Sequence, residues 1–182
     1  MCPNRHDTPL DERSEWVSRF ATLVPAGRPV LDVACGSGRH SLLFLERGHP
    51  VTAIDRDAAQ LKLAAETPGL TVIEADLEDG SPWPLADLRF GGVVVSNYLW
   101  RPLFATLIAA LEPGGALIYE TFALGNERFG RPRNPDHLLK PGELLEAVRG
   151  RLRVVAYEDI ERPPPKPARI QRICAVSPGQ PR

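Results

Sequence analysis

The stretch PVLDVACGSGRH, residues 29–40, joins a short apolar run to a glycine-rich turn and the first residues of a helix. Residues 29–34 have the composition of a buried strand, and the apolar spacing after the turn is helical as far as Gly48. Gly36 and Gly38 have no side chains, so the backbone can adopt positive φ there and approach a ligand closely. The stretch therefore predicts the first strand–turn–helix unit of an open parallel sheet, with a ligand at the turn.

The rest of the chain alternates strand-like and helix-like segments. Further strands are expected at 50–55, 70–76, 91–97, 116–122, 151–161 and 168–177, and further helices at 11–24, 56–67, 101–112 and 143–150. Strand and helix alternate in the first part, whereas the last two strands have only the stiff segment RPPPKP between them. The pattern predicts an α/β fold with a doubly wound, Rossmann-like, seven-stranded and mostly parallel sheet. The last two strands should form an antiparallel hairpin at one edge.

Length and composition suit one domain with one core. The chain has 182 residues, 43% of them apolar, and neither an internal repeat nor a domain linker is evident. We expect a single domain over 1–182, with an N-terminal helix at about 11–24. A cofactor-side half would follow at about 29–97 and an acceptor-side half at about 98–176.

The charge and the cysteines exclude several classes of protein. A formal net charge of −1 argues against a general nucleic-acid coat or a membrane-surface protein. The second half is nevertheless basic, with 13 Lys and Arg against 9 Asp and Glu in residues 101–182. Cys2, Cys35 and Cys174 form no spaced pair, so neither a disulfide framework nor a metal site is expected. No apolar run approaches a membrane span, and the simplest expectation is a reduced, cytoplasmic protein.

Asp32 decides between two kinds of ligand at the glycine turn. A dinucleotide site would need a third glycine, but Ser41 stands where GxGxxG would place it. A carboxylate four residues before Gly36 would repel a pyrophosphate and attract a cation. S-adenosylmethionine offers an ammonium and a sulfonium and carries no phosphate, so Asp32 favours this cofactor.

The pattern Asp32-x-Ala34-x-Gly36-x-Gly38 resembles motif I of the class I S-adenosylmethionine-dependent methyltransferases, with Ala34 where that family more often has glycine. The segment GSGRHSLLFLERGH and the short single-domain layout are similar to those of the small family members that are grouped with tellurite-resistance and thiol-detoxifying enzymes. The resemblance covers about residues 12–176, because the acids that end the next two strands and the segment LEPGGALIYETF follow in order.

The resemblance implies roles for further residues. Asp55, at the end of the second strand, would accept hydrogen bonds from the ribose hydroxyls. Asp76 would take the adenine amino group, the Leu77 amide would face a ring nitrogen, and Arg56 would stack on the ring. The backbone at Asn97, which ends the fourth strand, would line the methyl-transfer pocket.

Structural roles stand as alternatives to these. Asp32 could cap the following helix, Asp55 could cap the segment after it, and Asp76 could be an ordinary turn residue. Cys35 suits a small buried filler better than a nucleophile. His40, in the first turn of a helix, suits packing or capping better than acid–base chemistry.

The acceptor side is less informative, because methyl transfer from a sulfonium requires mainly alignment and leaves few signature residues. Candidates at the ends of the fourth and fifth strands and in the long connection after them are Asn97, Tyr98, Glu120, Arg128 and His137. The connection lacks clear secondary structure and holds Arg128, Arg131 and Arg133. It is either a solvated loop or a lid over an anionic acceptor.

The sequence thus predicts a methyltransferase that acts on a small-molecule acceptor, which could be anionic, with S-adenosylmethionine as cofactor. An RNA or protein methyltransferase that docks through the basic half is one alternative, although the charge makes a nucleic-acid partner less favoured. A non-catalytic S-adenosylmethionine binder and a nucleotide-dependent oxidoreductase are the others. The sequence does not fix the oligomeric state.

Overall fold

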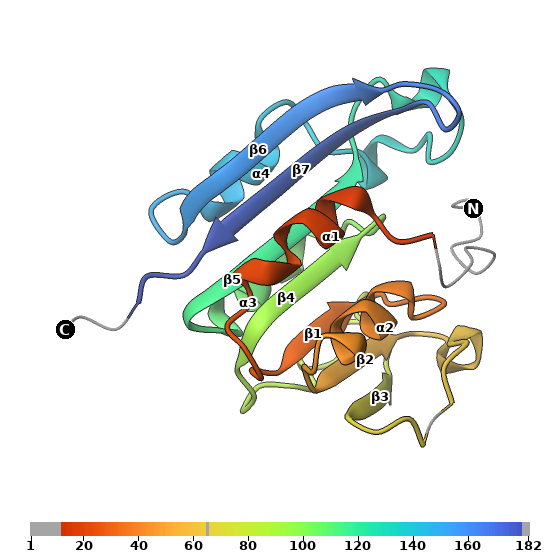
Figure 1. Ribbon diagram of the computed structural model, residues 1–182. Coiled ribbons are helices and arrows are strands. Elements are labelled where there is room, and N and C mark those ends of the chain that lie inside the picture. Colours follow the sequence, from red (N-terminus) through yellow and green to blue (C-terminus); the bar gives the residue numbers. More distant parts are fainter. Residues whose placement is uncertain (1–11, 65, 180–182) are drawn as a thin grey trace.

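A computed structural model describes residues 12–64 and 66–179 and shows a seven-stranded sheet in the order β3-β2-β1-β4-β5-β7-β6 (Figure 1). The strands are β1 (Val30–Val33), β2 (Val51–Asp55), β3 (Leu70–Glu74), β4 (Phe90–Ser96), β5 (Leu111–Phe122), β6 (Arg153–Arg162) and β7 (Ala168–Val176). Strands β1 to β5 pair in parallel, and β7 pairs antiparallel with both β5 and β6. The predicted fold class is therefore confirmed, including the antiparallel hairpin at one edge.

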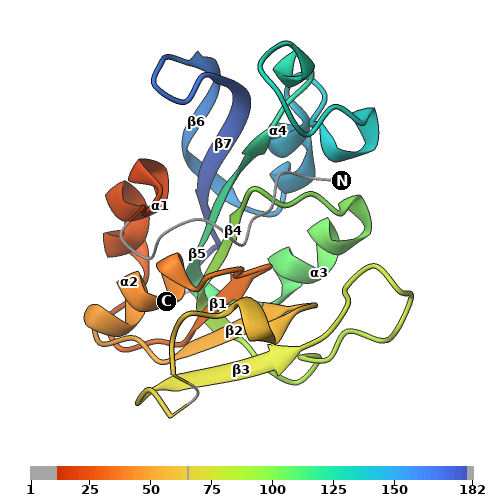
Figure 2. The same ribbon diagram turned by 90° about the vertical axis from the view of Figure 1, so that its right-hand side faces the viewer.

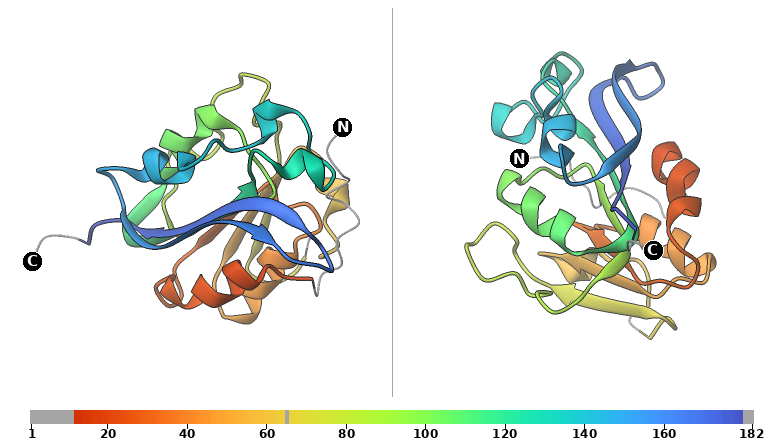
Figure 3. Two further views of the ribbon diagram at one scale, coloured as in Figure 1. Left: turned by 90° about the horizontal axis from the view of Figure 1, so that it is seen from above. Right: turned by 90° about the vertical axis from the view of Figure 1, so that its left-hand side faces the viewer.

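Short helices cover both faces of the sheet (Figures 2 and 3). The α-helices are α1 (Glu15–Phe20), α2 (Arg39–Glu46), α3 (Phe104–Ala109) and α4 (Glu143–Val148), and the 3₁₀ turns are η2 (Ala21–Leu23), η3 (Ala58–Gln60), η4 (Arg101–Leu103), η5 (Asn126–Arg128) and η6 (Pro135–His137). Helices α1 and α2 lie on one face, and α3 and α4 lie on the other. No helix within 12–64 and 66–179 is long and apolar enough to cross a membrane.

The alternation of side chains along the central strands divides the core into two layers. On β1, Val30 packs in the cluster under α1 and α2, whereas Leu31 and Val33 pack in the cluster under α3 and α4. Because β1 is covered on both faces, it reads as a continuous apolar run. Asp32 interrupts that run on the α2 side, and it is 2% exposed.

The helix expected at 56–67 is wrong. Within the described part of this segment, which leaves out residue 65, only the 3₁₀ turn Ala58–Gln60 forms, and residues 61–63 then run across the glycine turn as coil. The amide of Lys62 donates to the carbonyl of Ser37 over 3.1 Å, and the side chains of Leu61 and Leu63 cover Gly38. These tertiary contacts outweigh the helix propensity of the segment, which is a weak preference.

Two other boundaries differ from the expectation. Strand β5 begins at Leu111, five residues before the expected start at 116, so the segment LEPGG belongs to the strand and the preceding helix is shorter. The N-terminal helix is α1 followed by η2, and its expected first residue, 11, lies outside the described residues, as does Cys2.

Candidate functional site

The glycine turn lies where strand order reverses. Strand β1 pairs with β2 on one side and with β4 on the other, so the turn after β1 opens at the switch point of the sheet. Ala34, Gly36 and Gly38 have φ of 52°, 53° and 81°. The left-handed conformation is unfavourable for a residue with a side chain, and Ala34 is the smallest such residue. A β-carbon on Gly38 would lie 2.5 Å from Leu61 Cδ1, so a larger residue would have to move that side chain in addition to adopting an unfavourable φ.

Asp55 holds the turn from the neighbouring strand. Its Oδ2 accepts a hydrogen bond of 2.9 Å from the amide of Gly36, and its Oδ1 accepts one of 3.2 Å from the amide of Asp57. The contact with Asp57 gives Asp55 part of the local role expected of a capping residue. The contact with Gly36 fixes the position of the turn relative to β2. Each carboxylate oxygen retains a second lone pair, so the side chain can accept further hydrogen bonds.

Asp32 is a buried acid beneath the same turn. Its Oδ2 accepts a hydrogen bond of 2.7 Å from the hydroxyl of Ser41 on α2. Burial raises the pKa of Asp32 from 3.8 to about 6, while the bond from Ser41 and the charge of Arg39 lower it. The buried carboxylate has no direct ion-pair partner among the described residues, so a bound cation would relieve its desolvation.

A small cavity, here called the loop hollow, opens between the turn and the end of β4. It has a volume of about 20 Å³, room for about one water molecule. Its lining residues are Asp32, Ala34, Cys35, Gly36, Ser37, Arg39, His40, Ser96 and Asn97. The hollow thus brings together the predicted Asp32, turn and Asn97, and it adds Arg39 and Ser96, which the motif did not identify.

Residues 12–14 cross the outer end of the loop hollow as an N-terminal strap. The amide of Ser14 donates to His40 Nε2 over 3.1 Å, and the Ser14 hydroxyl donates to Glu120 Oε1 over 2.9 Å. The carbonyl of Glu12 accepts from Arg39 Nη1 over 2.8 Å. Burial lowers the pKa of His40 to about 3, so the ring is neutral and can accept the amide proton. His40 therefore has a structural role, although it holds Ser14 and does not cap its own helix.

A larger opening, here called the outer cleft, lies between the segment after β3 and the segment after β4. Its volume is about 690 Å³. Its lining residues are Arg56, Glu74, Ala75, Asp76, Leu77, Glu78, Asp79, Gly80, Ser81, Pro82, Trp83, Pro84, Trp100, Pro102, Leu103 and Thr106. Three predicted cofactor residues, Arg56, Asp76 and Leu77, therefore share one cleft. Asp76 also forms the turn that the alternative interpretation expected, because its Oδ1 accepts 2.9 Å from the amide of Glu78.

Comparison with known proteins identifies the family. The model described as "Methyltransferase domain" matches residues 30–115, which run from β1 through the glycine turn into β5. The chain belongs to the class I S-adenosylmethionine-dependent methyltransferases. The resemblance drawn from residues 32–38 is confirmed.

Curated relatives of this methyltransferase chain are named "Trans-aconitate 2-methyltransferase". The protein from Rhodopseudomonas palustris (strain BisB5) is 30% identical over 178 residues, which cover 93% of this chain and 61% of the relative. The protein from Acidovorax sp. (strain JS42) is 34% identical over 97 residues, which cover 51% of this chain and 38% of the relative. The methyltransferase chain therefore spans less than two thirds of the length of these relatives.

Solved structures share the fold. TehB from Haemophilus influenzae has a TM-score of 0.70 at 16% identity, covering 88% of this methyltransferase and 61% of TehB. The glycopeptide N-methyltransferase MtfA, solved with S-adenosyl-L-homocysteine, has a TM-score of 0.61 at 26% identity and 91% coverage of both chains. The likeness to TehB agrees with the grouping read from the sequence at the level of fold.

The acceptor-side candidates of this methyltransferase are mostly engaged in structural contacts. The Asn97 amide donates to the Glu120 carbonyl over 2.9 Å, and Asn97 has φ of 56° at the edge of the loop hollow. Tyr98 is 6% exposed in the core, where its carbonyl accepts from the Tyr119 hydroxyl over 2.8 Å. Glu120 Oε2 lies 3.4 Å from Arg172 Nη1, so both of its carboxylate oxygens have partners.

Arg128 and His137 lie in the long connection between β5 and α4. Arg128 forms an ion pair with Glu161 on β6, and its guanidinium lies 5.2 Å from the centre of the Phe129 ring. His137 ends the 3₁₀ turn η6 and is half-buried. The structure therefore brings Asn97 to the loop hollow but ties Arg128 to the β6 end of the hairpin.

The connection is more ordered than the sequence suggested. It contains η5 and η6, and Leu138 and Leu139 are 1% and 0% exposed. Leu139 forms a parallel bridge with Ala123, and the carbonyl of Lys140 accepts from Gln171 Nε2 over 2.7 Å. The part near 138–140 is therefore fixed to the sheet, and a lid could involve only the earlier part.

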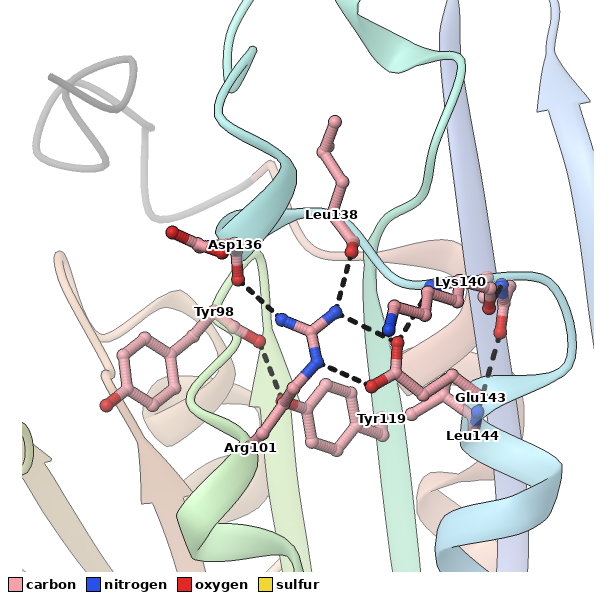
Figure 4. A network of polar contacts seen from close by, with 9 residues as sticks. Tyr98, Arg101, Tyr119, Asp136, Leu138, Lys140, Glu143 and Leu144 are labelled. Atoms are coloured by element: carbon pink, nitrogen blue, oxygen red, sulfur yellow. Dashed lines mark hydrogen bonds and ion pairs between the residues drawn. The ribbon is translucent and has the colours of Figure 1, made fainter.

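Arg101 fastens this connection, and sequence reasoning missed it (Figure 4). Its Nε and Nη2 donate to the two carboxylate oxygens of Glu143 over 2.6 and 3.0 Å. Its Nη1 and Nη2 also donate to the carbonyls of Asp136 and Leu138 over 2.7 and 2.8 Å. The guanidinium fork thus joins η4, the connection and the start of α4. Its partners lie 35 to 42 residues away in sequence, so no local motif could have revealed it.

Proposed function

We propose that the chain binds S-adenosylmethionine across the loop hollow and the outer cleft and methylates a small-molecule acceptor. The observation that carries this proposal is Asp32, a buried carboxylate beneath a glycine turn, which suits an ammonium and disfavours a phosphate. Family membership supports it, because the matched domain contains both the turn and Asp32. We further propose that residues 29–97 supply the cofactor half of a single domain and residues 98–176 the acceptor half.

The proposed cofactor contacts follow the sequence prediction and the placement of each residue. Asp32, Ala34, Gly36, Gly38 and Asn97 would surround the methionyl tail, Asp55 would accept from the ribose hydroxyls, and Arg56, Asp76 and Leu77 would hold the adenine. Asp55 suits the ribose because each of its oxygens has a lone pair beyond the bond it already accepts. Leu77 suits the adenine because it is half-buried on the wall of the outer cleft.

For the acceptor, we propose a small molecule that carries a carboxylate. The curated relatives are named for trans-aconitate, a small anion with three carboxylates, and the second half of the chain is basic. Because the chain spans less than two thirds of those relatives, trans-aconitate is the first acceptor to test and one member of the class. RNA is less favoured, since the net charge of the whole chain is −1.

A carboxylate acceptor agrees with the shortage of available bases near the loop hollow. The bound cofactor would supply an electrophilic methyl group, which a carboxylate oxygen attacks as the carbon–sulfur bond breaks, giving a methyl ester and a neutral thioether. A carboxylate is already deprotonated at neutral pH, so no general base is required. His40 accepts from Ser14, and Glu120 contacts both Ser14 and Arg172, so both side chains serve the fold. Catalysis would then depend mainly on the alignment of the acceptor oxygen with the methyl group.

Calorimetry and a methyl-release assay test the proposal. We expect S-adenosylhomocysteine to bind and NADH and NADPH not to bind. In the assay, di- and tricarboxylates including trans-aconitate should be methylated, whereas their methyl esters and bulk RNA should not. Turnover on RNA that falls steeply with salt would favour the RNA methyltransferase instead. Tight cofactor binding without turnover on any acceptor would favour a non-catalytic binder.

A further inference from the structure

The two parts of the proposed cofactor site differ in how open they are. The outer cleft has a volume of about 690 Å³, within the range of about 300–1,000 Å³ that is typical of small-ligand pockets. The loop hollow has a volume of about 20 Å³, which is room for about one water molecule. An amino-acid tail is several times larger than a water molecule. An adenine ring therefore has room in the cleft, whereas a tail can enter the hollow only if a neighbouring segment moves.

The N-terminal strap, residues 12–14, is the segment beside the hollow that is best able to move. It is held by hydrogen bonds and ion pairs, and none of its side chains is fully buried. The helix α1 follows directly and is anchored by three buried side chains, those of Trp16, Val17 and Phe20. On the other wall of the hollow, the glycine turn is fixed by Asp55. The strap can therefore swing away from the hollow while α1 and the glycine turn stay in place.

A stiff turn holds the strap from outside. The segment RPPPKP, residues 162–167, runs from the end of β6 to β7 and is here called the proline turn. Its Lys166 forms an ion pair with the carboxylate of Glu12, and its Arg162 Nε donates to the Lys166 carbonyl over 2.7 Å. Figures 1 and 3 show the start of α1 and this turn at the same end of the sheet. Because the prolines restrict the backbone, the turn presents Lys166 to the strap at a fixed place.

We propose that the strap and the proline turn form a gate over the tail end of the cofactor site, held closed by the ion pair between Glu12 and Lys166. This inference rests on the proposed use of S-adenosylmethionine. A ligand with an amino-acid tail has to displace the strap, so breaking the strap contacts weakens its binding. A nucleoside without the tail needs only the outer cleft and the ribose contacts, so the gate does not affect it. The side chains of Lys166 and Glu12 are 64% and 45% exposed, so salt weakens the pair and favours opening.

Titration calorimetry tests the gate by comparing S-adenosylhomocysteine with 5′-methylthioadenosine, which keeps the nucleoside and sulfur and lacks the amino-acid tail. The full chain is compared with Lys166→Met, Glu12→Gln and the two combined. Each single variant should bind S-adenosylhomocysteine about 2- to 5-fold more tightly than the unaltered chain, which is the effect expected from loss of an exposed ion pair. The double variant should gain nothing further, because both changes break the same pair. All four chains should bind 5′-methylthioadenosine equally.

Salt dependence and hydrogen exchange give two independent readouts. Raising the salt concentration from about 0.01 M to about 0.15 M should tighten the binding of S-adenosylhomocysteine to the unaltered chain but not to Lys166→Met. The amide of Ser14, which donates to His40, should exchange faster when S-adenosylhomocysteine binds and should not respond to 5′-methylthioadenosine. Arg149→Met removes an exposed ion pair with Glu146 at the other end of β6, so this control should change none of these results.

Three results would overturn the gate. One is an unchanged affinity for S-adenosylhomocysteine in both single variants, and another is an equal gain for 5′-methylthioadenosine, since the ion pair would then act on the whole site. The third is slower exchange of the Ser14 amide in the complex with S-adenosylhomocysteine, because the strap would then close over the ligand instead of being displaced by it. If the unaltered chain binds neither nucleoside, the proposed function itself fails.

Discussion

The glycine turn and the long connection after β5 both lie at the carboxyl edge of the parallel strands, yet they are built differently. The turn is held by Asp55 and Ser41, which lie within about one strand–helix–strand unit of the residues they contact. The connection is held by Arg101 and Gln171, which reach it from segments 31 to 37 residues away in sequence. A local unit can be complete before the rest of the chain folds, whereas the connection needs the finished sheet.

The difference suggests what substitutions should do at each end. Changes at the turn should alter ligand binding and leave the fold intact. The reason is that β1 and α2, which flank the turn, are held by their own buried side chains. Changes at the connection should alter both stability and acceptor binding, because the connection is fixed to the sheet and belongs to the acceptor half that we propose. Four predictions test this contrast, in descending order of expected effect.

Asp32→Asn should give the largest change and the clearest separation of binding from stability. We expect affinity for S-adenosylhomocysteine to fall about 100-fold, because the ammonium loses its buried counter-charge. Stability should rise at neutral pH. The raised pKa of Asp32, from 3.8 to about 6, means that ionisation destabilises the folded state as pH rises through that range. The gain at pH 7 should be on the order of 2–3 kcal/mol and should vanish below about pH 4.

Denaturant unfolding at pH 4 and pH 7 together with calorimetry measures both effects. Ser41→Ala serves as a matched control, because it removes the hydroxyl that donates to Asp32 and keeps the carboxyl group itself. It should lower stability and keep most of the affinity. A loss of stability in Asp32→Asn at pH 7 would contradict the account of the buried acid.

His40→Gln should change the acid sensitivity of the strap. Burial lowers the pKa of His40 from 6.5 to about 3, so its contribution to stability is present above 6.5 and is lost as pH falls toward 3. Protonation would also remove the Nε2 lone pair that accepts from the Ser14 amide. Glutamine does not titrate and can accept the same bond. We expect the loss of unfolding free energy between pH 7 and pH 4 to shrink by at least about 1.4 kcal/mol.

His49→Gln is the control for this measurement. His49 is also buried, and its Nδ1 lies 2.9 Å from the carbonyl of Arg28, at the other end of α2. If both variants flatten the pH profile equally, the effect is a general one of buried histidines and the strap has no special part in it.

The same contrast explains how much the sequence could predict. The succession of strands along the chain, the glycine turn and the positions of Asp32, Asp55 and Asp76 follow from local patterns, since each acid lies within its own strand or just after it. The strap contacts of Ser14 and the fork of Arg101 depend on which distant segments the sheet brings together, and no spacing in the chain encodes them. At residues 56–67 a local pattern gave a wrong prediction. The segment has the composition of a helix, but the packing of Leu61 and Leu63 on Gly38 outweighs that propensity.

Replacing Arg128, Arg131 and Arg133 with alanine tests whether the exposed part of the connection recognises the acceptor. We expect the KM for the carboxylate acceptor found in the methyl-release screen to rise about 5- to 10-fold, with affinity for S-adenosylhomocysteine unchanged. The physical reason is the loss of positive charge on the part of the connection that Arg101 does not fasten. Replacing Arg149 and Arg151, on the turn before β6 at the opposite edge, should leave the KM unchanged. An equal rise in both variants would show only a general effect of net charge.

Arg101→Lys should give the smallest effect and the one that links stability with acceptor binding. Lysine keeps the charge but cannot donate to Glu143, Asp136 and Leu138 at once, so the connection loses part of its attachment. We expect a loss of about 1 kcal/mol in unfolding free energy and faster hydrogen exchange in residues 134–140, with a rise of two- to threefold in the acceptor KM. Arg149→Lys is the matched control, since its ion pair with Glu146 is exposed and should contribute little. If Arg101→Lys loses stability without faster exchange in that segment, the guanidinium of Arg101 supports α4 alone. The glycine turn and the connection would then differ less than their contacts indicate.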